Sequence, residues 1–156
     1  MENIKIFAKI QVYNYNELNL VEKNLIDTAK EAVKRAYAPY SRFQVGAAVL
    51  LANQEIISGS NQENVAFPSG LCAERTTLFY ANSRFPDTAV EAIAVAAYTQ
   101  GDFTADPVSP CGACRQVILE TQNRYQHPVR ILLYGKKAVY VIEQIADLLP
   151  LAFGTF

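Results

Sequence analysis

Three cysteines and one glutamate are the residues of this chain best suited to metal chemistry. Cys111 and Cys114 form a C-x-x-C pair, and Cys72 lies apart from them with Glu74 two residues later. Residues i and i+3 share one face of a helical turn, so both thiolates of the pair can meet one ion. Thiolates are preferred ligands of tetrahedral zinc. The pattern predicts one zinc ion per chain, held by Cys72, Cys111 and Cys114.

A three-thiolate set leaves tetrahedral zinc one protein ligand short. Structural zinc sites are filled by four protein ligands, whereas catalytic sites keep one position for water. His127 is the only histidine and the one obvious candidate for a fourth structural ligand. It precedes Pro128 just before a predicted strand, away from the segments that carry the cysteines. We therefore interpret the site as catalytic.

Glu74 is placed to move protons at such a site without binding the metal. A carboxylate beside a metal-activated water acts first as general base and later as general acid. Zinc deaminases combine three ligands, an activated water and a glutamate that is not a ligand. Three thiolates with Zn²⁺ sum to −1, and this excess weakens the metal as a Lewis acid. Arg75, or alternatively Arg115, could offset it by donating hydrogen bonds to a cysteine sulfur.

Both cysteine segments follow loops and open predicted helices, from about Cys72 to Asn82 and from about Cys111 to Asn123. The partial positive charge of a helix N-terminus lowers a cysteine pKa and favours the thiolate. Two further helices are predicted, one from Leu20 to Ala36 after an Asn19 cap and a last one over Val141–Leu148 before Pro150.

Strands are predicted between these helices. Alternating apolar residues favour a strand over Ile4–Tyr15, and a hairpin is expected over 43–51 and 55–58. Continuous apolar runs at 90–98 and 129–134 are typical of strands buried on both faces. The alternation of strands and helices predicts an α/β fold with a mixed sheet.

Length and charge limit the classes of function. The 156 residues, 51% hydrophobic, fit a single domain over 1–156, with a possible N-terminal strand extension at 1–16. The net charge of −1 and the lack of a Lys/Arg run argue against a nucleic-acid polymer as partner. Neither a secretion signal nor a membrane-spanning stretch is visible, and the odd cysteine count favours metal chemistry over disulfides. We expect a cytoplasmic protein.

Five segments follow one another along the chain from Ser41 to Gly154. They are Ser41-Arg42-Phe43-Gln44-Val45-Gly46-Ala47-Ala48, Asn61-Gln62-Glu63-Asn64, Cys72-Ala73-Glu74-Arg75-Thr76, Pro110-Cys111-Gly112-Ala113-Cys114-Arg115-Gln116, and Leu148-Leu149-Pro150-Leu151-Ala152-Phe153-Gly154. Together, in this order, they resemble the small, homotetrameric class of cytidine deaminases. The resemblance covers about Leu20 to Phe153 and is specific because the segments occur together.

The resemblance implies substrate-binding roles for five residues. Phe43 is expected to contact the pyrimidine ring, and Asn61 and Glu63 the ribose hydroxyls. Ala73 is expected to offer its backbone to the edge of the base. Phe153 is expected to approach the active site of a neighbouring subunit.

The resemblance also implies the fold and the reaction. The expected fold is a three-layer α/β/α arrangement with a five-stranded mixed sheet, assembled as a homotetramer with shared active sites. The expected reaction is hydrolytic deamination of cytidine and deoxycytidine to uridine and deoxyuridine plus ammonia, in pyrimidine salvage. Glu74 would take a proton from water and protonate N3 of the cytosine ring, while the oxygen attacks C4.

Two alternatives stay open on the residues alone. One is a related enzyme that deaminates another aminopyrimidine nucleoside, such as the antibiotic blasticidin S; the Asn61 and Glu63 pair favours an ordinary ribose instead. The other is an inactive, zinc-stabilised binding protein, against which the intact Glu74 argues. Phe67 stands where the family often has tyrosine, which removes one hydroxyl. Residues 1–16 could add an edge strand or a subunit contact.

Overall fold

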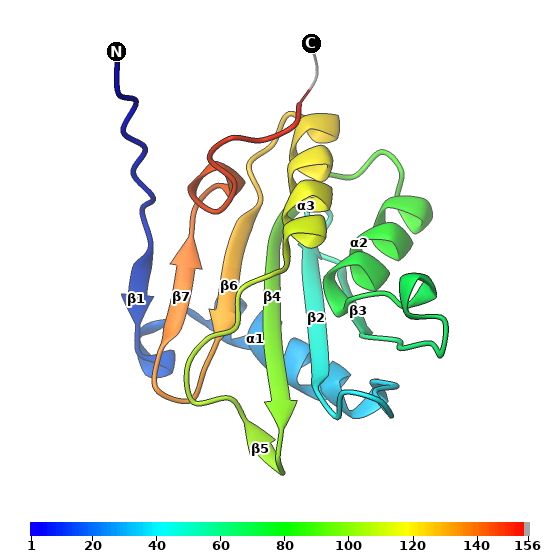
Figure 1. Ribbon diagram of the computed structural model, residues 1–156. Helices are drawn as coiled ribbons and strands as arrows, with labels where there is room; N and C mark the ends of the chain where they lie inside the picture. Colours follow the sequence, from blue (N-terminus) through cyan, green and yellow to red (C-terminus); the bar gives the residue numbers. More distant parts are fainter. Residues whose placement is uncertain (155–156) are drawn as a thin grey trace.

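A mixed β-sheet with helices on both faces forms the centre of the computed structural model, which describes residues 1–154 (Figure 1). The strand order is β1-β7-β6-β4-β2-β3, and β5 pairs with β4 beside this path. Among the strands of residues 1–154, β4 and β6 pair in parallel and the other neighbouring strands pair antiparallel. The strands are β1 Gln11–Tyr13, β2 Gln44–Leu51, β3 Ile56–Ser60, β4 Val90–Thr99, β5 Asp102–Phe103, β6 Arg130–Tyr134 and β7 Val139–Ile142.

Helices α1 Leu20–Ala32, α2 Ala73–Arg84 and α3 Gly112–Tyr125 make the outer layers. Short 3₁₀ turns lie at Tyr15–Glu17, Val33–Arg35, Phe67–Ser69 and Ile145–Asp147. None of the helices in the described part of the chain is long and apolar enough to cross a membrane.

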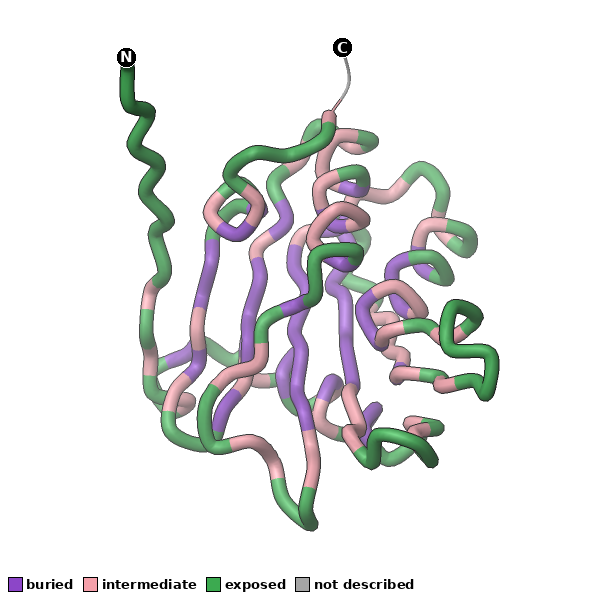
Figure 2. Tube along the Cα trace, viewed as in Figure 1, coloured by how far each residue is buried: buried purple, intermediate pink, exposed green. Residues whose placement is uncertain are grey.

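Each face of the sheet supports its own apolar core, because successive strand residues point to opposite faces. Ile93 and Ile131 pack with Leu78 of α2 and Ile118 of α3 on one face. On the other face, side chains such as Leu132 pack against α1. The central strands are buried along most of their length, as Figure 2 shows. The predicted α/β fold in three layers, with helices flanking a mixed sheet, is confirmed.

Helix α1 begins as its sequence indicates. The Asn19 side chain accepts a hydrogen bond from the Glu22 N–H, and the Glu22 carboxylate accepts one from the Asn19 N–H, which makes a capping box. The helix then lies very close to β2, where Gly46 faces its backbone. A Cβ atom at Gly46 would lie 2.0 Å from the carbonyl oxygen of Ala29 and 2.7 Å from the nitrogen of Val33.

Strand register gathers the loops of interest at one end of the sheet. Gln44 pairs with Tyr98, so the start of β2 lies beside the end of β4. Gly46 pairs with Ser60, so the end of β3 lies there too. The loop after β3 leads into α2, and the loop after β5 leads into α3. Residues far apart in the sequence are therefore brought to the same region.

The predicted last helix, Val141–Leu148, is wrong. Val139–Ile142 forms β7, which pairs antiparallel with β6, and only the 3₁₀ turn Ile145–Asp147 follows. The run Val139-Tyr140-Val141-Ile142 consists of β-branched and aromatic residues, which favour strands. A tight turn leads into β7, in which the N–H of Gly135 donates to the carbonyl of Ala138 at 2.9 Å. A side chain at Gly135 would meet the backbone of Asp106 and Pro107, because a Cβ there would lie 2.5 Å from the Pro107 nitrogen.

The predicted strand Ile4–Tyr15 is much shorter than expected. It is confined to Gln11–Tyr13, paired with Val139–Val141 of β7, because β7 itself offers only four residues. Residues 1–10 carry no regular secondary structure, although the N–H of Lys9 donates to Asp147 at 2.9 Å. Because β5 and β7 add to the predicted strands, the described sheet has seven strands, whereas the resemblance implied five.

The contact at Gly46 gives the first prediction. Gly46→Ala should lower the free energy of unfolding by about 1–3 kcal/mol, because backbone atoms of α1 must move away from the added methyl group. Denaturation in urea measures the change. The matched control is Gly154→Ala, where a Cβ meets no described atom within 4 Å and the change should stay within about 0.5 kcal/mol. Equal stability of the two variants would contradict the close approach of α1 to β2.

Candidate zinc centre and active site

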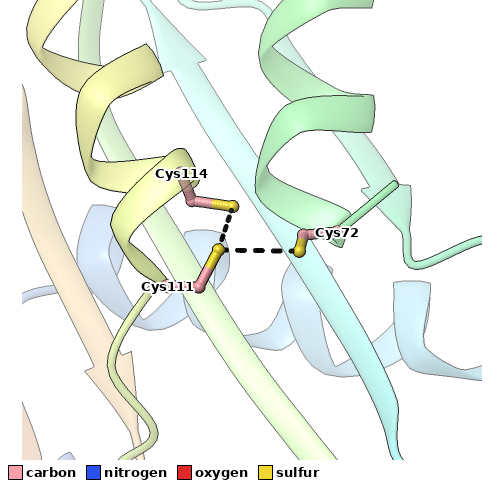
Figure 3. A group of neighbouring side chains, drawn as sticks. All are labelled: Cys72, Cys111 and Cys114. Atoms are coloured by element: carbon pink, nitrogen blue, oxygen red, sulfur yellow. Dashed lines mark hydrogen bonds between the residues drawn. The ribbon is translucent and has the colours of Figure 1, made fainter. Parts of the chain in front are cut away.

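The three cysteines meet where α2 and α3 begin (Figure 3). Cys72 is the N-cap of α2, Cys111 is the N-cap of α3, and Cys114 lies in the first turn of α3. The Sγ atom of Cys111 lies 3.8 Å from that of Cys72 and 3.4 Å from that of Cys114. All three sulfur atoms lie within 4.8 Å of one another.

The spacing of the sulfur atoms fits tetrahedral zinc. Zn–S bonds of about 2.3 Å place two sulfur ligands of a tetrahedral ion about 3.8 Å apart. Among residues 1–154, no fourth side chain of ligating type joins the three thiols within the 4.8 Å limit. His127 follows the C-terminus of α3, while the cysteines lie at its N-terminus. The 14 residues of α3 span about 21 Å, so His127 is too distant to complete the set.

Two helix N-termini and a guanidinium surround the thiols. Interaction with Cys114, followed by smaller contributions from Arg75 and Cys111, lowers the pKa of the Cys72 thiol to about 5 against the opposing effect of burial. The same contact with Cys72, together with burial and the charge of Glu74, raises the pKa of Cys114. The first thiolate of the cluster therefore forms at Cys72, and a dication favours ionisation of the others.

Glu74 lies in the first turn of α2 and is 5% exposed. Burial is the main reason that the pKa of its carboxyl lies above the ordinary value, and the negative charge of Cys72 adds to it. The Cys114 thiol lies close enough to oppose the shift through a hydrogen bond. A carboxyl group that is desolvated in this way is suited to both accepting and returning a proton.

The two candidate arginines differ in where they point. Nη2 of Arg75 lies 3.7 Å from the Cys72 sulfur, and Nε of Arg75 is buried without a hydrogen-bond partner in residues 1–154. The Arg115 guanidinium instead donates to the carbonyls of Pro110 and Leu148 at 2.8 and 2.7 Å. The alternative role considered for Arg115 at the sulfurs therefore fails. Arg115 ties the start of α3 to the C-terminal segment.

A cavity of about 540 Å³ lies beside Cys72 and Arg75, and Asn61 and Glu63 line it as well. The Asn61 amide is held in place, since its oxygen accepts from the N–H of Val45 at 2.8 Å and its nitrogen donates to the carbonyl of Phe43 at 2.9 Å. Tyr40, Gly70 and Leu71 also line the cavity and belong to none of the segments that resemble the family. Ser41, Gln62 and Asn64 lie within those segments, and Phe67 stands where the family often has tyrosine, but no binding role was predicted for them.

The remaining predicted residues, Phe43, Ala73 and Phe153, differ in burial and in their position relative to the cavity. Phe43 is half-buried next to the Asn61 amide. Ala73 is fully buried as the first residue of α2, where helix N–H groups lack intrahelical partners. Phe153 is 74% exposed and does not line the cavity; its carbonyl accepts from Gln116 at 2.8 Å. Of the predicted residues, Asn61, Glu63, Cys72 and Arg75 line the cavity, whereas Phe43, Ala73 and Glu74 are not among its lining residues.

Comparison with known proteins places this site in a family. The model of the cytidine and deoxycytidylate deaminase zinc-binding region matches residues 21–126, which is more than half of the chain, and the chain belongs to this family. Zinc is accordingly the metal that the three-cysteine cluster holds.

Relatives are similar over most of their length. The cytidine deaminase of Sporosarcina psychrophila is 45% identical over 134 residues, which cover 86% of this chain and 91% of that protein. The cytidine deaminase of Halalkalibacterium halodurans is 51% identical over 96 residues, covering 62% of this chain and 68% of the other. The crystal structure of cytidine deaminase from Burkholderia pseudomallei is similar with a TM-score of 0.71 at 40% identity, covering 83% of this chain and 97% of that one.

The thiol cluster gives the second prediction. Cys111→Ser should lower zinc affinity by more than about 100-fold, because the loss of a direct ligand exceeds the effect of losing an outer partner. Competition with a chromogenic chelator measures the affinity. The control is His127→Ala, which should keep one zinc per chain because His127 lies at the far end of α3. Loss of zinc in the control would contradict the three-cysteine site.

Proposed function

We propose that this protein is a zinc-dependent hydrolase that deaminates cytidine and deoxycytidine to uridine and deoxyuridine, releasing ammonia. The observation that carries the proposal is the buried Glu74 carboxyl beside a cluster of three thiols without a fourth ligand in the described chain. This cluster adjoins a cavity lined by Asn61 and Glu63. Membership in the deaminase family and the names of the relatives support this reaction over a purely structural metal site.

Glu74 performs the proton transfers in this proposal. Zinc, when bound, supplies water that can be deprotonated near neutral pH. Glu74 accepts that proton and delivers it to N3 of the cytosine ring as the oxygen adds to C4. Glu74 then takes the remaining proton of the added hydroxyl and passes it to the amino group. The C4–N bond breaks, the amino group leaves as ammonia, and a carbonyl forms at C4. The raised pKa of the Glu74 carboxyl suits both directions of transfer.

The other predicted residues bind the nucleoside or adjust the charge of the thiolates. Asn61 and Glu63 hold the ribose, Phe43 contacts the pyrimidine ring and Ala73 offers its backbone to the base. Arg75 is a positioning residue: its contact with the Cys72 sulfur draws negative charge from the thiolates. Three free thiols suit a reducing compartment, which supports a cytoplasmic location. In this proposal the protein is a single-domain enzyme of pyrimidine salvage. It acts on free nucleosides rather than on nucleic-acid polymers.

Removal of the Glu74 carboxylate should abolish turnover without loss of the metal. Glu74→Gln keeps the size of the side chain, but the amide cannot shuttle a proton, so kcat should fall by at least about 10²–10⁴-fold. Loss of cytosine absorbance measures the rate, and metal analysis measures zinc. A zinc-loaded parent that converts neither cytidine nor deoxycytidine would contradict the proposed function. A fully active Glu74→Gln variant would contradict the role of Glu74.

We also propose a homotetramer in which Phe153 reaches the active site of a neighbouring subunit. Large apolar side chains remain exposed near the cavity and on the helices, among them Val65, Phe67, Phe79 and Tyr80. Phe153 is exposed as well, which suits a contact with another subunit. Such a group of exposed apolar side chains is typical of an interaction surface.

Light scattering during gel filtration tests the assembly. The expected mass is that of four chains of 17.3 kDa. Phe153→Ala should lower activity toward cytidine, while Leu151→Ala, also at an exposed position of the C-terminal segment, serves as the control. A monomer with full activity would contradict the proposed assembly and the role of Phe153.

A further inference from the structure

Glu63 is held by hydrogen bonds rather than by packing. Glu63 is half-buried, and both of its carboxylate oxygens are engaged by the turn that precedes β2. Oε2 accepts from the N–H of Tyr40 at 2.9 Å and from the N–H of Ser41 at 3.2 Å, while Oε1 accepts from the Ser41 hydroxyl. The two N–H bonds occupy Oε2, so Oε1 keeps the free acceptor position for a ligand.

The proton of the Ser41 hydroxyl has a fixed direction. The N–H of Phe43 donates to Oγ of Ser41 at 3.0 Å, so the hydroxyl serves as acceptor there and gives its own proton to Glu63. The carbonyl of Phe43 in turn accepts from the Asn61 amide. Ser41 therefore joins Glu63 to Phe43 and, through the backbone of Phe43, to Asn61.

The turn that presents Ser41 is itself constrained. Arg42 has a φ of 55°, a left-handed conformation that is uncommon for a residue other than glycine. Its N–H donates to the carbonyl of Ala38 at 3.0 Å, and its carbonyl accepts from Thr99 of β4 at 3.3 Å. Uncommon backbone of this kind persists where the surroundings hold it, and it concentrates at functional sites. The turn is fixed to the end of β4, and Ser41 lines the cavity.

We infer that Ser41 is a positioning residue for sugar recognition, whose hydroxyl aims the Glu63 carboxylate at a hydroxyl group of the nucleoside sugar. This inference rests on the proposed function, because it assigns Glu63 to the sugar. The Ser41 hydroxyl is also the largest of the causes that lower the pKa of Glu63, which keeps the carboxylate ionised as an acceptor. Without the Ser41 hydroxyl, Oε2 of Glu63 keeps its two backbone N–H donors but Oε1 loses its partner, so the carboxylate is less firmly oriented and ordering it costs binding free energy.

Two substrates separate this role from a general effect on the loop. Cytidine carries sugar hydroxyls, whereas 2′,3′-dideoxycytidine lacks those that Glu63 could bind. Ser41→Ala should raise KM for cytidine about tenfold with kcat little changed. The same change should leave kcat/KM for 2′,3′-dideoxycytidine within about twofold. Ser41→Thr, which keeps the hydroxyl, should restore KM for cytidine.

Coupling to Glu63 is tested by a double-mutant cycle. Glu63→Gln should weaken cytidine binding, and Ser41→Ala added to Glu63→Gln should have little further effect, because Ser41 acts through that carboxylate. Thr28→Ala is the matched control, since its hydroxyl donates to the carbonyl of Asn24 within α1 at 2.8 Å. Thermal unfolding and zinc content of each variant report whether the fold is intact.

The outcomes are distinct. If Ser41→Ala lowers kcat/KM equally for both substrates, or if its effect adds fully to that of Glu63→Gln, then Ser41 only supports the loop and the inference is overturned. If the parent turns over cytidine and Ser41→Ala matches it, the inference alone fails. If the zinc-loaded parent neither deaminates cytidine nor binds uridine in calorimetry, the proposed function fails, and this inference fails with it.

Discussion

The convergence of two helix N-termini on one point is the constraint on which the rest of the site depends. Cys72 and Cys111 cap α2 and α3, so each thiol lies beside free backbone N–H groups and the positive end of a helix. The two helices are held together by a shared apolar layer on one face of the sheet, which includes Leu78 and Ile118. The spacing of the sulfur atoms follows from this packing. A metal ion would join segments that are 39 residues apart in the sequence.

The other half of the cavity is fixed by different forces. Asn61 and Glu63 lie on a loop after β3, and hydrogen bonds to the backbone around Phe43 set their directions. Glu74 and Cys114 thus lie in a buried, packed region, whereas Asn61 and Glu63 are fixed by a partly exposed network of hydrogen bonds. Changes in such a network can alter substrate preference with little effect on the core, because few packing contacts depend on it.

The sequence was most informative where local signals agreed with the final structure. The Asn19 cap predicted the start of α1, and the loops before Cys72 and Cys111 predicted where α2 and α3 begin. The C-x-x-C spacing with Cys72 and Glu74 likewise predicted residues that the fold brings together.

The failures of prediction depended on long-range contacts. The β-branched and aromatic residues of Val139–Ile142 favour a strand, but no local pattern identifies β6 as its pairing partner. The length of β7 limits how many N-terminal residues can pair with it. The sequence of residues 4–15 carries no information about that length. The link from Ser41 to Glu63 joins residues 22 positions apart, and only the turn before β2 brings them together. The role proposed for Phe153 depends on a second chain, so neither the sequence nor the fold of one chain tests it.

The proposed chemistry requires a zinc ion with three protein thiolates and one position left for a small oxygen ligand. X-ray absorption at the zinc edge of the zinc-loaded protein tests this coordination directly. We expect three sulfur neighbours at about 2.3 Å and one light atom at about 2.0 Å. That light atom should lack the outer-shell scattering of an imidazole ring. Four sulfur neighbours, or a histidine in the fourth position, would make the site structural and rule out the proposed chemistry.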